Sequence, residues 1–241
     1  MTIRIAMWSG PRNISTAMMR SWENRPDCDV VDEPFYAFYL QQTQSPHPYF
    51  DEVIQAQSSN YDTVATQLSQ GPVNAKIQYQ KHMTHHMLAN VDLSWTKNIR
   101  HCFLIREPSE IVNSYTQSRG VCSAEDIGII RQSQLFDEIS QVTGQNIPVI
   151  NSNDVLQHAD RLIPKLCDAL QVEFSANMLS WPSGRRCSDG VWAKHWYHSV
   201  EASTGFATVA KKTFTLNSAQ QRVVDQVMPY YTHLKAHSIS L

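Results

Sequence analysis

The stretch that decides the fold lies at the beginning of the chain: Ile3–Trp8 (IRIAMW), Ser9–Thr16 (SGPRNIST) and Ala17–Trp22 (AMMRSW). The first segment is short and mostly apolar, which is typical of a buried parallel strand. A Gly-Pro pair ends that strand, and a Ser-Thr pair followed by apolar residues favours a helix start. We therefore expect a strand, a tight loop and a helix that packs on the same sheet.

The loop Ser9–Thr16, which we call the opening loop, is predicted to bind an anion. Its amides and the first free N–H groups of the helix point into one concavity, and the helix dipole favours negative charge there. Arg12 adds a guanidinium group, and Ser15 and Thr16 add hydroxyl groups, so we expect a phosphate or a sulfate. The loop lacks the second Gly and the Lys of a Walker A motif. The alternative is an ordinary strand-to-helix turn whose serine caps the helix.

Composition and charge exclude several classes of protein. The chain has 241 residues, a hydrophobic fraction of 42% and a net charge of −2. Its length suits one large domain or two small ones, and because no low-complexity linker divides the chain we predict one domain over residues 1–241. The net charge argues against partners such as nucleic acid or a membrane. Five cysteines without a CxxC pair indicate neither a disulfide framework nor a zinc knuckle. With no run of about 18 apolar residues and no room for a signal peptide, we expect a cytoplasmic protein.

Apolar runs alternate with helical stretches along the chain. The expected strands are Ile3–Trp8, Cys28–Val31, Val73–Tyr79, His101–Ile105 and Ile147–Asn151. Because strands joined by helical crossovers form a parallel sheet, we predict an α/β, P-loop-like fold with about five strands and helices on both faces. The polar, aromatic and Pro-bearing stretch Phe35–Tyr61 is expected to be an irregular excursion over the surface.

Ligands of such sheets bind at the carboxyl ends of the strands. Arg106 comes directly after the fourth expected strand, Pro108 suits the first position of a helix, and Ser114 lies two turns later. Arg106 and Ser114 are therefore expected to converge on one anion at the edge of the cleft. The alternative is that Arg106 pairs locally with Glu110 and that Ser114 is an ordinary hydroxyl of the helix surface.

These two anion sites resemble those of the sulfotransferase family that uses 3′-phosphoadenosine 5′-phosphosulfate (PAPS). In that family a first loop, P-[KR]-S-G-T-T, binds the 5′-phosphosulfate, and a later R-x-P-x-x-x-x-x-S motif binds the 3′-phosphate. The segment Pro11–Thr16 matches the first pattern with Asn-Ile in place of Ser-Gly, and Arg106, Pro108 and Ser114 match the second. The resemblance implies that the donor is bound by Pro11, Arg12, Asn13, Ile14, Ser15, Thr16, Arg106 and Ser114.

A late segment extends the resemblance. Gly184–Trp196 is similar to the family's Arg/Lys-Gly…Gly-Asp-Trp-Lys loop, which folds over the nucleotide. We therefore expect Arg185, Arg186 and Gly190 to belong to a loop that closes on the donor. The alternative is a solvated pair of arginines. The motifs run from residue 9 to about residue 206, so the resemblance covers most of the chain.

The implied reaction moves a sulfuryl group from PAPS to a hydroxyl or amine of a small-molecule acceptor and leaves adenosine 3′,5′-bisphosphate. Because negative charge grows on the leaving phosphate, preplaced cations and amides are the main requirement, and Arg12 is expected to supply such a cation. We expect no metal ion to take part, since the sulfuryl group carries less negative charge than a γ-phosphoryl group.

A base must still remove the acceptor proton. Glu33 follows the second strand and is the first choice, because related bacterial sulfotransferases use a Glu in this region. His82, after the third expected strand, is the second choice, since other members of the family place a catalytic His there. Glu33 is alternatively a solvated loop carboxylate or a partner of Arg12. Lys81 is expected either to neutralise charge on the transferring group or to be exposed.

Three further readings stay open at this level. His82 and His86 are four residues apart, but without a carboxylate motif or a Cys partner we expect no metal site. An ATP-dependent small-molecule kinase of the P-loop type would need the Walker Lys and a metal-binding acid, both missing. A module that binds adenosine 3′,5′-bisphosphate without catalysis would keep its ligand affinity when Glu33 and His82 are changed.

Overall fold

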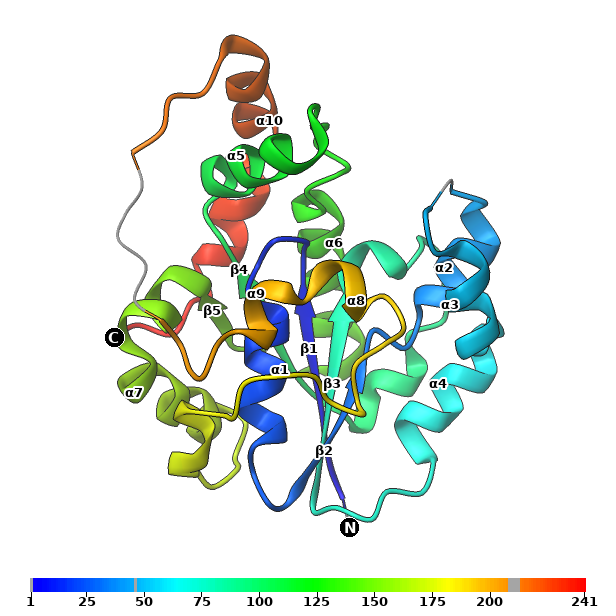
Figure 1. Cartoon of the computed structure of the whole chain (residues 1–241). Helices are drawn as coiled ribbons and strands as arrows, with labels where there is room; N and C mark the ends of the chain where they lie inside the picture. Colours follow the sequence, from blue (N-terminus) through cyan, green and yellow to red (C-terminus); the bar gives the residue numbers. More distant parts are fainter. Residues whose placement is uncertain (1, 46, 208–212) are drawn as a thin grey trace.

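The computed structural model describes residues 2–45, 47–207 and 213–241, and it has a parallel β-sheet at its centre (Figure 1). The sheet has five strands in the order β2-β3-β1-β4-β5. Their bounds are β1 Ile3–Ser9, β2 Cys28–Asp32, β3 Ile77–Met83, β4 Arg100–Ile105 and β5 Val149–Asn151. The predicted α/β fold with a parallel sheet of five strands is therefore confirmed.

The central strand β1 is buried on both of its faces. Ile5 and Met7 point into one hydrophobic cluster, Ala6 and Trp8 point into the other, and all four side chains are 0% exposed. Successive residues of a strand face opposite sides of a sheet, so two helical layers are needed to cover this sequence. This is why the opening strand is a nearly continuous apolar run.

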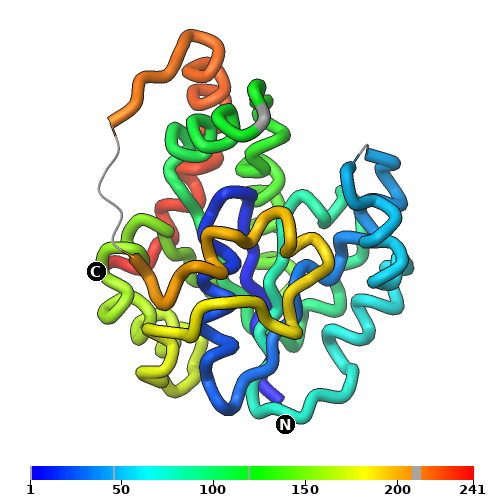
Figure 2. Tube along the Cα trace, in the orientation of Figure 1, coloured from blue at the N-terminus to red at the C-terminus, as the bar shows by residue number. Residues whose placement is uncertain are grey.

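Helices form these two layers, as Figures 1 and 2 show. The cluster on the first face includes α1 Ser15–Glu23, α2 Tyr36–Thr43, α3 Phe50–Ala56, α7 Ser152–Ala169, η3 Ala176–Leu179 and α8 Ala193–Trp196. The cluster on the second face includes α4 Tyr61–Gln70, α5 Pro108–Arg119, α6 Ile129–Thr143 and α10 Ser218–Lys235. Short turns complete the described elements: η1 Thr84–His86, η2 Ser94–Asn98 and α9 His198–Glu201. None of the described helices combines the length and apolar character that crossing a bilayer requires.

The third strand lies further along the chain than the sequence predicts. It spans Ile77–Met83 rather than Val73–Tyr79, so Lys81 and His82 lie inside the strand. Both side chains are 1% exposed. The apolar pattern stops at Tyr79 because the strand continues with polar residues, and these can be buried because β1 and β2 pair with it on either side. A rule that ends strands at polar residues therefore fails here.

The stretch Phe35–Tyr61 is not the irregular excursion that the sequence predicts. It contains the helices α2, which begins shortly after the end of β2, and α3, which follows α2. Their apolar side chains Ala37, Leu40 and Val53 are 0% exposed and pack in the first cluster. Tertiary packing of one apolar side thus forms helices that the local sequence signals only weakly.

Candidate functional site

The opening loop has an unusual backbone that suits an anion. Arg12 and Ile14 have φ angles of 59° and 42°, in the left-handed region that a β-branched residue such as Ile rarely adopts. Alternation of right- and left-handed residues turns successive amides toward one point, and Ser15 and Thr16 then begin α1. The predicted strand, loop and helix start are therefore all present.

Side chains from several elements fix the opening loop in place. Asn13 is buried, and its Nδ2 donates to the carbonyl oxygen of Leu104 at the end of β4, 2.5 Å away. Gln132 Nε2 of α6 donates to the carbonyls of Trp8 and Leu104. Gly10 has no room for a side chain, because a Cβ atom there would lie 2.9 Å from the Ile127 carbonyl oxygen. The Asn13 side chain thus anchors the opening loop, so that Asn13 has only its backbone available for a ligand.

The structure brings the two predicted anion sites together. Arg106 Nη1 donates to the carbonyl oxygen of Arg12 at 2.8 Å, so its guanidinium faces the opening loop. Arg12 Nε in turn donates to Ser114 Oγ at 3.1 Å. The local pair also exists, because Arg106 Nε lies 2.9 Å from Glu110 Oε2. Arg12, Arg106 and Ser114 form what we call the basic cluster, which lies at the carboxyl ends of β1 and β4.

A second group of side chains lies at the ends of β2 and β3. We call Asp32, Glu33, Lys81 and Tyr197 the buried charge cluster. Lys81 Nζ lies 2.8 Å from Asp32 Oδ1, 2.5 Å from Glu33 Oε1 and 2.6 Å from Tyr197 Oη. All three ammonium protons therefore have an acceptor, which makes the burial of this cation tolerable. The expectation that Lys81 is an exposed lysine is wrong.

Glu33 is held in this cluster by an unusual backbone turn. Its φ angle is 44°, and its N–H donates to the Lys81 carbonyl oxygen. Only 9% of the residue is exposed, so it is not a solvated loop carboxylate. Burial raises the pKa of the Glu33 carboxyl, with a further contribution from the Asp32 charge, while Lys81 opposes the shift. A carboxylate whose pKa moves toward neutrality is suited to act as a general base.

His82 lies in a different environment from the other proposed base. Its ring stacks on Trp8 with ring centroids 4.2 Å apart, and Trp8 belongs to the second hydrophobic cluster. Neighbouring residues of a strand face opposite sides, so His82 points away from Lys81 and Glu33. Burial, aided by His101, lowers the pKa of His82 to about 3. The side chain is therefore neutral at working pH, and its surroundings do not favour a role as the base.

His82 and His86 do not converge. His86 stacks on the ring of Tyr36 on the other side of the sheet, with ring centroids 4.3 Å apart. Within the part of the chain that the structure describes, no group of three or more His, Cys, Asp or Glu side chains is arranged to hold a metal ion.

The late segment is only partly placed as the resemblance implies. Gly190 does lie at the strand ends, because its N–H donates to Asp32 Oδ2 at 3.0 Å. Arg185 pairs with Glu201, the Arg186 guanidinium lies 3.8 Å from Glu23, and the Arg186 backbone N–H donates to Asp189 Oδ2 at 2.8 Å. Glu23 is the last residue of α1, about 12 Å along the helix axis from the opening loop. The contacts of the two arginines therefore do not support their predicted place beside the donor.

Sequence analysis missed Asp32 and Tyr197 as site residues. Asp32 was visible as half of an acidic pair after a strand, and it pairs in register with Lys81 across β2 and β3. That register becomes known only when the strand order is known. Tyr197 lies 165 residues from Asp32 in the sequence, and its hydroxyl is 2.8 Å from Asp32 Oδ2. No local sequence pattern predicts this contact.

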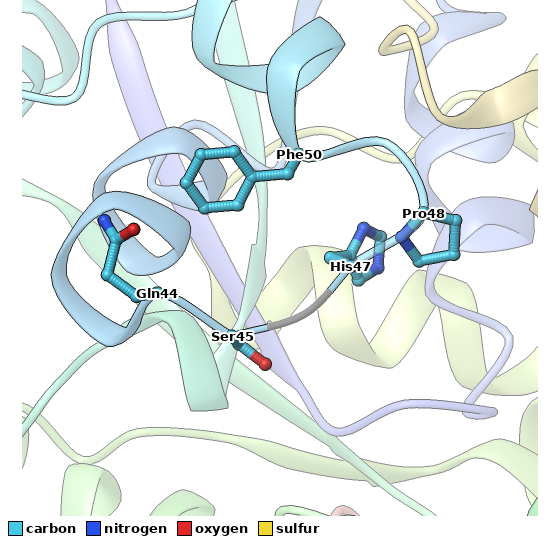
Figure 3. A pocket seen from close by; sticks show the side chains of 5 residues that line it. All are labelled: Gln44, Ser45, His47, Pro48 and Phe50. Atoms are coloured by element: carbon cyan, nitrogen blue, oxygen red, sulfur yellow. The ribbon is translucent and has the colours of Figure 1, made fainter.

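A separate hollow of about 550 Å³ lies between the end of α2 and the start of α3. Figure 3 shows the side chains that line it, which are those of Gln44, Ser45, His47, Pro48 and Phe50. It is wide open to solvent and shares no residue with the basic cluster or the buried charge cluster. Its His47 Nε2 is 2.6 Å from Tyr36 Oη, which connects it to the aromatic side chains of α2.

Comparison with known families decides the class of this protein. A family model described as a sulfotransferase domain matches residues 3–238, which include both clusters. The chain belongs to the sulfotransferase family. The resemblance seen in the opening loop and in the Arg106 motif is thereby confirmed at the level of the family.

Two curated relatives of this sulfotransferase-family chain come from Arabidopsis thaliana. They are named branched-chain-amino-acid aminotransferase-like protein 1 and protein 2, and they are 32% and 30% identical over 233 residues. The alignments cover 97% of this chain but only 42% and 41% of the two relatives. The chain therefore spans about two fifths of the length of these relatives.

Solved structures share the fold. The sulfotransferase domain of the Synechococcus PCC 7002 olefin synthase has a TM-score of 0.60 at 17% identity, covering 96% of this chain and 95% of that one. The sulfotransferase domain of the curacin biosynthetic pathway has a TM-score of 0.55 at 14% identity, with 95% and 98% covered. A sulfotransferase from Alicyclobacillus acidocaldarius has a TM-score of 0.56 at 9% identity, with 98% and 95% covered.

Proposed function

We propose that this chain transfers a sulfuryl group from PAPS to a hydroxyl or amine of a small-molecule acceptor, with all of the machinery in one domain. The observation that carries the proposal is the order of side chains along the carboxyl edge of the sheet. Glu33 follows β2, the opening loop follows β1, and Arg106 follows β4. Because the strand order is β2-β3-β1-β4, an anion in the opening loop has the guanidinium of Arg106 on one side and the carboxylate of Glu33, the proposed base, on the other.

The residues present fit such a donor. The backbone amides of the opening loop, with the hydroxyls of Ser15 and Thr16, would hold the 5′ end. Arg106 and Ser114 would hold the 3′-phosphate, and Arg12, which contacts Ser114, would connect the two ends. Pro11, Asn13 and Ile14 would act through the shape of the backbone rather than through their side chains.

Each cluster has a separate chemical task in this proposal. PAPS, when bound, supplies an activated sulfuryl group on a phosphate leaving group. Arg12 and the loop amides stabilise the negative charge that grows on that phosphate, and they do so without reorganising. Glu33 takes the proton of the acceptor, and Lys81 balances the charge of Glu33 until it does.

Ligand-dependent melting temperatures test the donor site. Adenosine 3′,5′-bisphosphate should raise the melting temperature of the protein more than AMP, because a ligand that binds only the native state stabilises it. Arg106→Ala should weaken binding of the bisphosphate about 10- to 100-fold, the loss of hydrogen bonds to a charged group, and should leave AMP binding nearly unchanged.

Arg131→Ala is the matched control for Arg106→Ala. Arg131 also pairs with a carboxylate of its own helix, Glu138 at 2.7 Å, but it lies on α6 and contacts the carbonyl of Met87. This variant should lower the melting temperature without changing the shift that either nucleotide causes. Equal losses of both nucleotides in Arg106→Ala would contradict the assignment of Arg106 to the 3′-phosphate.

A further inference from the structure

The hydroxyl group of Tyr197 has no part in the chemistry described so far, although it lies in the middle of the buried charge cluster. Tyr197 joins α8 to α9, in the segment that crosses the sheet in Figures 1 and 2, and the residue is 4% exposed. A tyrosine hydroxyl that is buried this deeply needs hydrogen-bond partners. Its partners are the charged groups beside Glu33.

The hydrogen bonds of Tyr197 Oη determine which group accepts its proton. Lys81 Nζ donates to it at 2.6 Å, and Trp192 Nε1 donates to it at 3.1 Å. Both of these groups are donors only, so the tyrosine proton goes to Asp32, whose Oδ1 and Oδ2 are 2.9 and 2.8 Å away. Tyr197 is therefore a neutral donor to the Asp32 carboxylate.

Asp32 and Glu33 compete for the same ammonium group. Lys81 donates to both carboxylates, and two negative charges face one positive charge. Asp32 receives further hydrogen bonds from Tyr197 and from the Gly190 N–H. These donors stabilise the negative charge of Asp32, so Asp32 attracts the Lys81 ammonium group less strongly. Lys81 therefore keeps its short contact with Glu33 Oε1.

We propose that Tyr197 is a positioning residue whose hydroxyl, through Asp32 and Lys81, holds the Glu33 carboxylate in the place where it receives the acceptor proton. This inference rests on the proposed function, in which Glu33 is the base. It assigns a role to the segment between Gly190 and Tyr197, which is distant from Glu33 in the sequence and supplies hydrogen bonds to the cluster that holds Glu33. Without the hydroxyl, Lys81 shifts toward Asp32, and Glu33 holds its proton more tightly.

The other charged and titratable groups near the buried charge cluster do not set how Lys81 is shared between Asp32 and Glu33. Burial lowers the pKa of Arg20 of α1, and Asp189 and Glu23, its ion-pair partners, raise it more than the charge of Asp32 does. His86 of η1 faces Lys81, and burial keeps the pKa of its imidazole well below the ordinary value, so it is neutral. Gln57, after α3, donates to the Glu33 carbonyl rather than to its carboxylate.

Tyr197→Phe tests the proposal because it removes the hydroxyl and keeps the ring. Two measurements are made on the full chain: the pH dependence of kcat, and the titration of Glu33 by ¹³C NMR of protein labelled at the Glu carboxyl carbon, with Glu33→Gln used to assign the signal. Both midpoints should move up by a few tenths of a pH unit to about one unit, where one unit is the effect of a direct hydrogen bond to a charged group, because the lost hydrogen bond is to Asp32 and acts on Glu33 through Lys81. KM for PAPS should change less than twofold.

Tyr61→Phe is the matched control. Its hydroxyl also accepts from a tryptophan, Trp95 Nε1 at 2.9 Å, but it donates to the backbone carbonyl of Asp92 and touches no charged cluster. This variant should move neither midpoint. If Tyr197→Phe does not fold, Trp192→Phe removes only one donor to Tyr197 Oη and should shift both midpoints in the same direction by a smaller amount.

The two readouts separate this inference from the proposed function. A Glu33 signal that titrates in Tyr197→Phe as it does in the unsubstituted protein, or at lower pH, overturns the role of Tyr197. A Glu33 signal that moves up while the kcat profile stays in place supports the positioning of Glu33 by Tyr197 and overturns Glu33 as the base. Equal shifts in both measurements support the two assignments together.

Discussion

The basic cluster and the buried charge cluster lie along the same edge of the sheet. They differ in how many hydrogen-bond donors of their charged side chains have an acceptor within the protein. The Arg106 side chain is 24% exposed and uses Nε and Nη1, and no described residue accepts a hydrogen bond from its Nη2. In the other cluster Lys81 is 1% exposed and all three of its protons have acceptors. The first arrangement keeps a donor available for a guest, and the second does not.

The difference suits the two clusters to different tasks. A partly exposed guanidinium loses little hydration until a ligand arrives, so it can contribute binding energy. A buried network instead fixes positions and sets pKa values, because its groups are held in a low dielectric. Binding of the donor is therefore expected to depend on Arg106 and Ser114, and the proton step on Glu33 and its neighbours.

The largest expected effect is that of Lys81→Met on stability. Removing the ammonium leaves Asp32 and Glu33 as two buried carboxylates without a cation, which should lower the free energy of unfolding by about 3–5 kcal/mol. Lys194→Met is the control, since Lys194 is 44% exposed and pairs with Glu52; its loss should cost less than about 1 kcal/mol. Urea denaturation at pH 7 measures both, and equal losses would show that the cluster is not a buried ion network.

Glu33→Gln should come next. With the proton acceptor gone, kcat should fall about a hundredfold or more, while the affinity for adenosine 3′,5′-bisphosphate stays the same. Steady-state rates and ligand titrations check the two halves of this statement. An unchanged kcat would move attention to His82, and unchanged binding with no turnover in either protein would favour the non-catalytic binding module.

The pH dependence of stability gives a second test at Glu33. Its pKa in the folded protein is raised above the ordinary value of 4.5, so its contribution favours folding at low pH and is lost as the pH rises through the raised pKa. The free energy of unfolding of the unsubstituted protein should therefore fall, relative to Glu33→Gln, as the pH rises above 4.5. Parallel curves for the two proteins would mean that the pKa of Glu33 is not raised.

A smaller effect is expected at the edge of the basic cluster. Ser114→Ala removes one hydroxyl that contacts Arg12 and should weaken adenosine 3′,5′-bisphosphate binding by about tenfold, with kcat changed less than that. Ser118→Ala, one turn later on the same helix, is the control; the Ser118 hydroxyl donates to the carbonyl of Tyr115. Isothermal titration distinguishes them, and identical affinities in the two variants would remove Ser114 from the 3′-phosphate site.

The smallest expected effect is that of a chelator. Ethylenediaminetetraacetate at millimolar concentration should leave the sulfuryl transfer rate unchanged, because Arg12, Arg106 and the loop amides supply the positive charge that a kinase takes from Mg²⁺. The rate is compared in dialysed protein before and after readdition of Mg²⁺. A rate that disappears and then returns would favour the kinase alternative.

Two segments show where prediction from the sequence succeeded. The apolar run, the Gly-Pro break and the Ser-Thr helix start fixed the strand, the opening loop and α1 at their observed places, because each of these signals acts on neighbouring residues. The spacing of Arg106, just before α5, and Ser114 on that helix predicted that both face one anion; Arg12 contacts both residues, and the shared anion stays a prediction. Local geometry converts such spacing directly into position.

Two other places show the limits of local sequence patterns. Lys81 and His82 looked like residues after a strand, but β3 continues through them because β1 and β2 pair with it on either side. Arg185 and Arg186 match a family pattern, and their part in binding the donor stays a prediction, since their side chains contact Glu201 and the far end of α1. In both cases the outcome depends on elements that are distant in the sequence.

The amino-acid sequence alone determined the α/β class, the opening loop and the Arg106 motif, since all of these follow from periodicity and short-range spacing. The tertiary structure decided that Asp32, Glu33, Lys81 and Tyr197 share one set of hydrogen bonds. Strand pairing brings Asp32 to Lys81, and packing of the late segment brings in Tyr197. Contacts between residues so far apart in the sequence arise only from the order of the strands and the path of the chain across them.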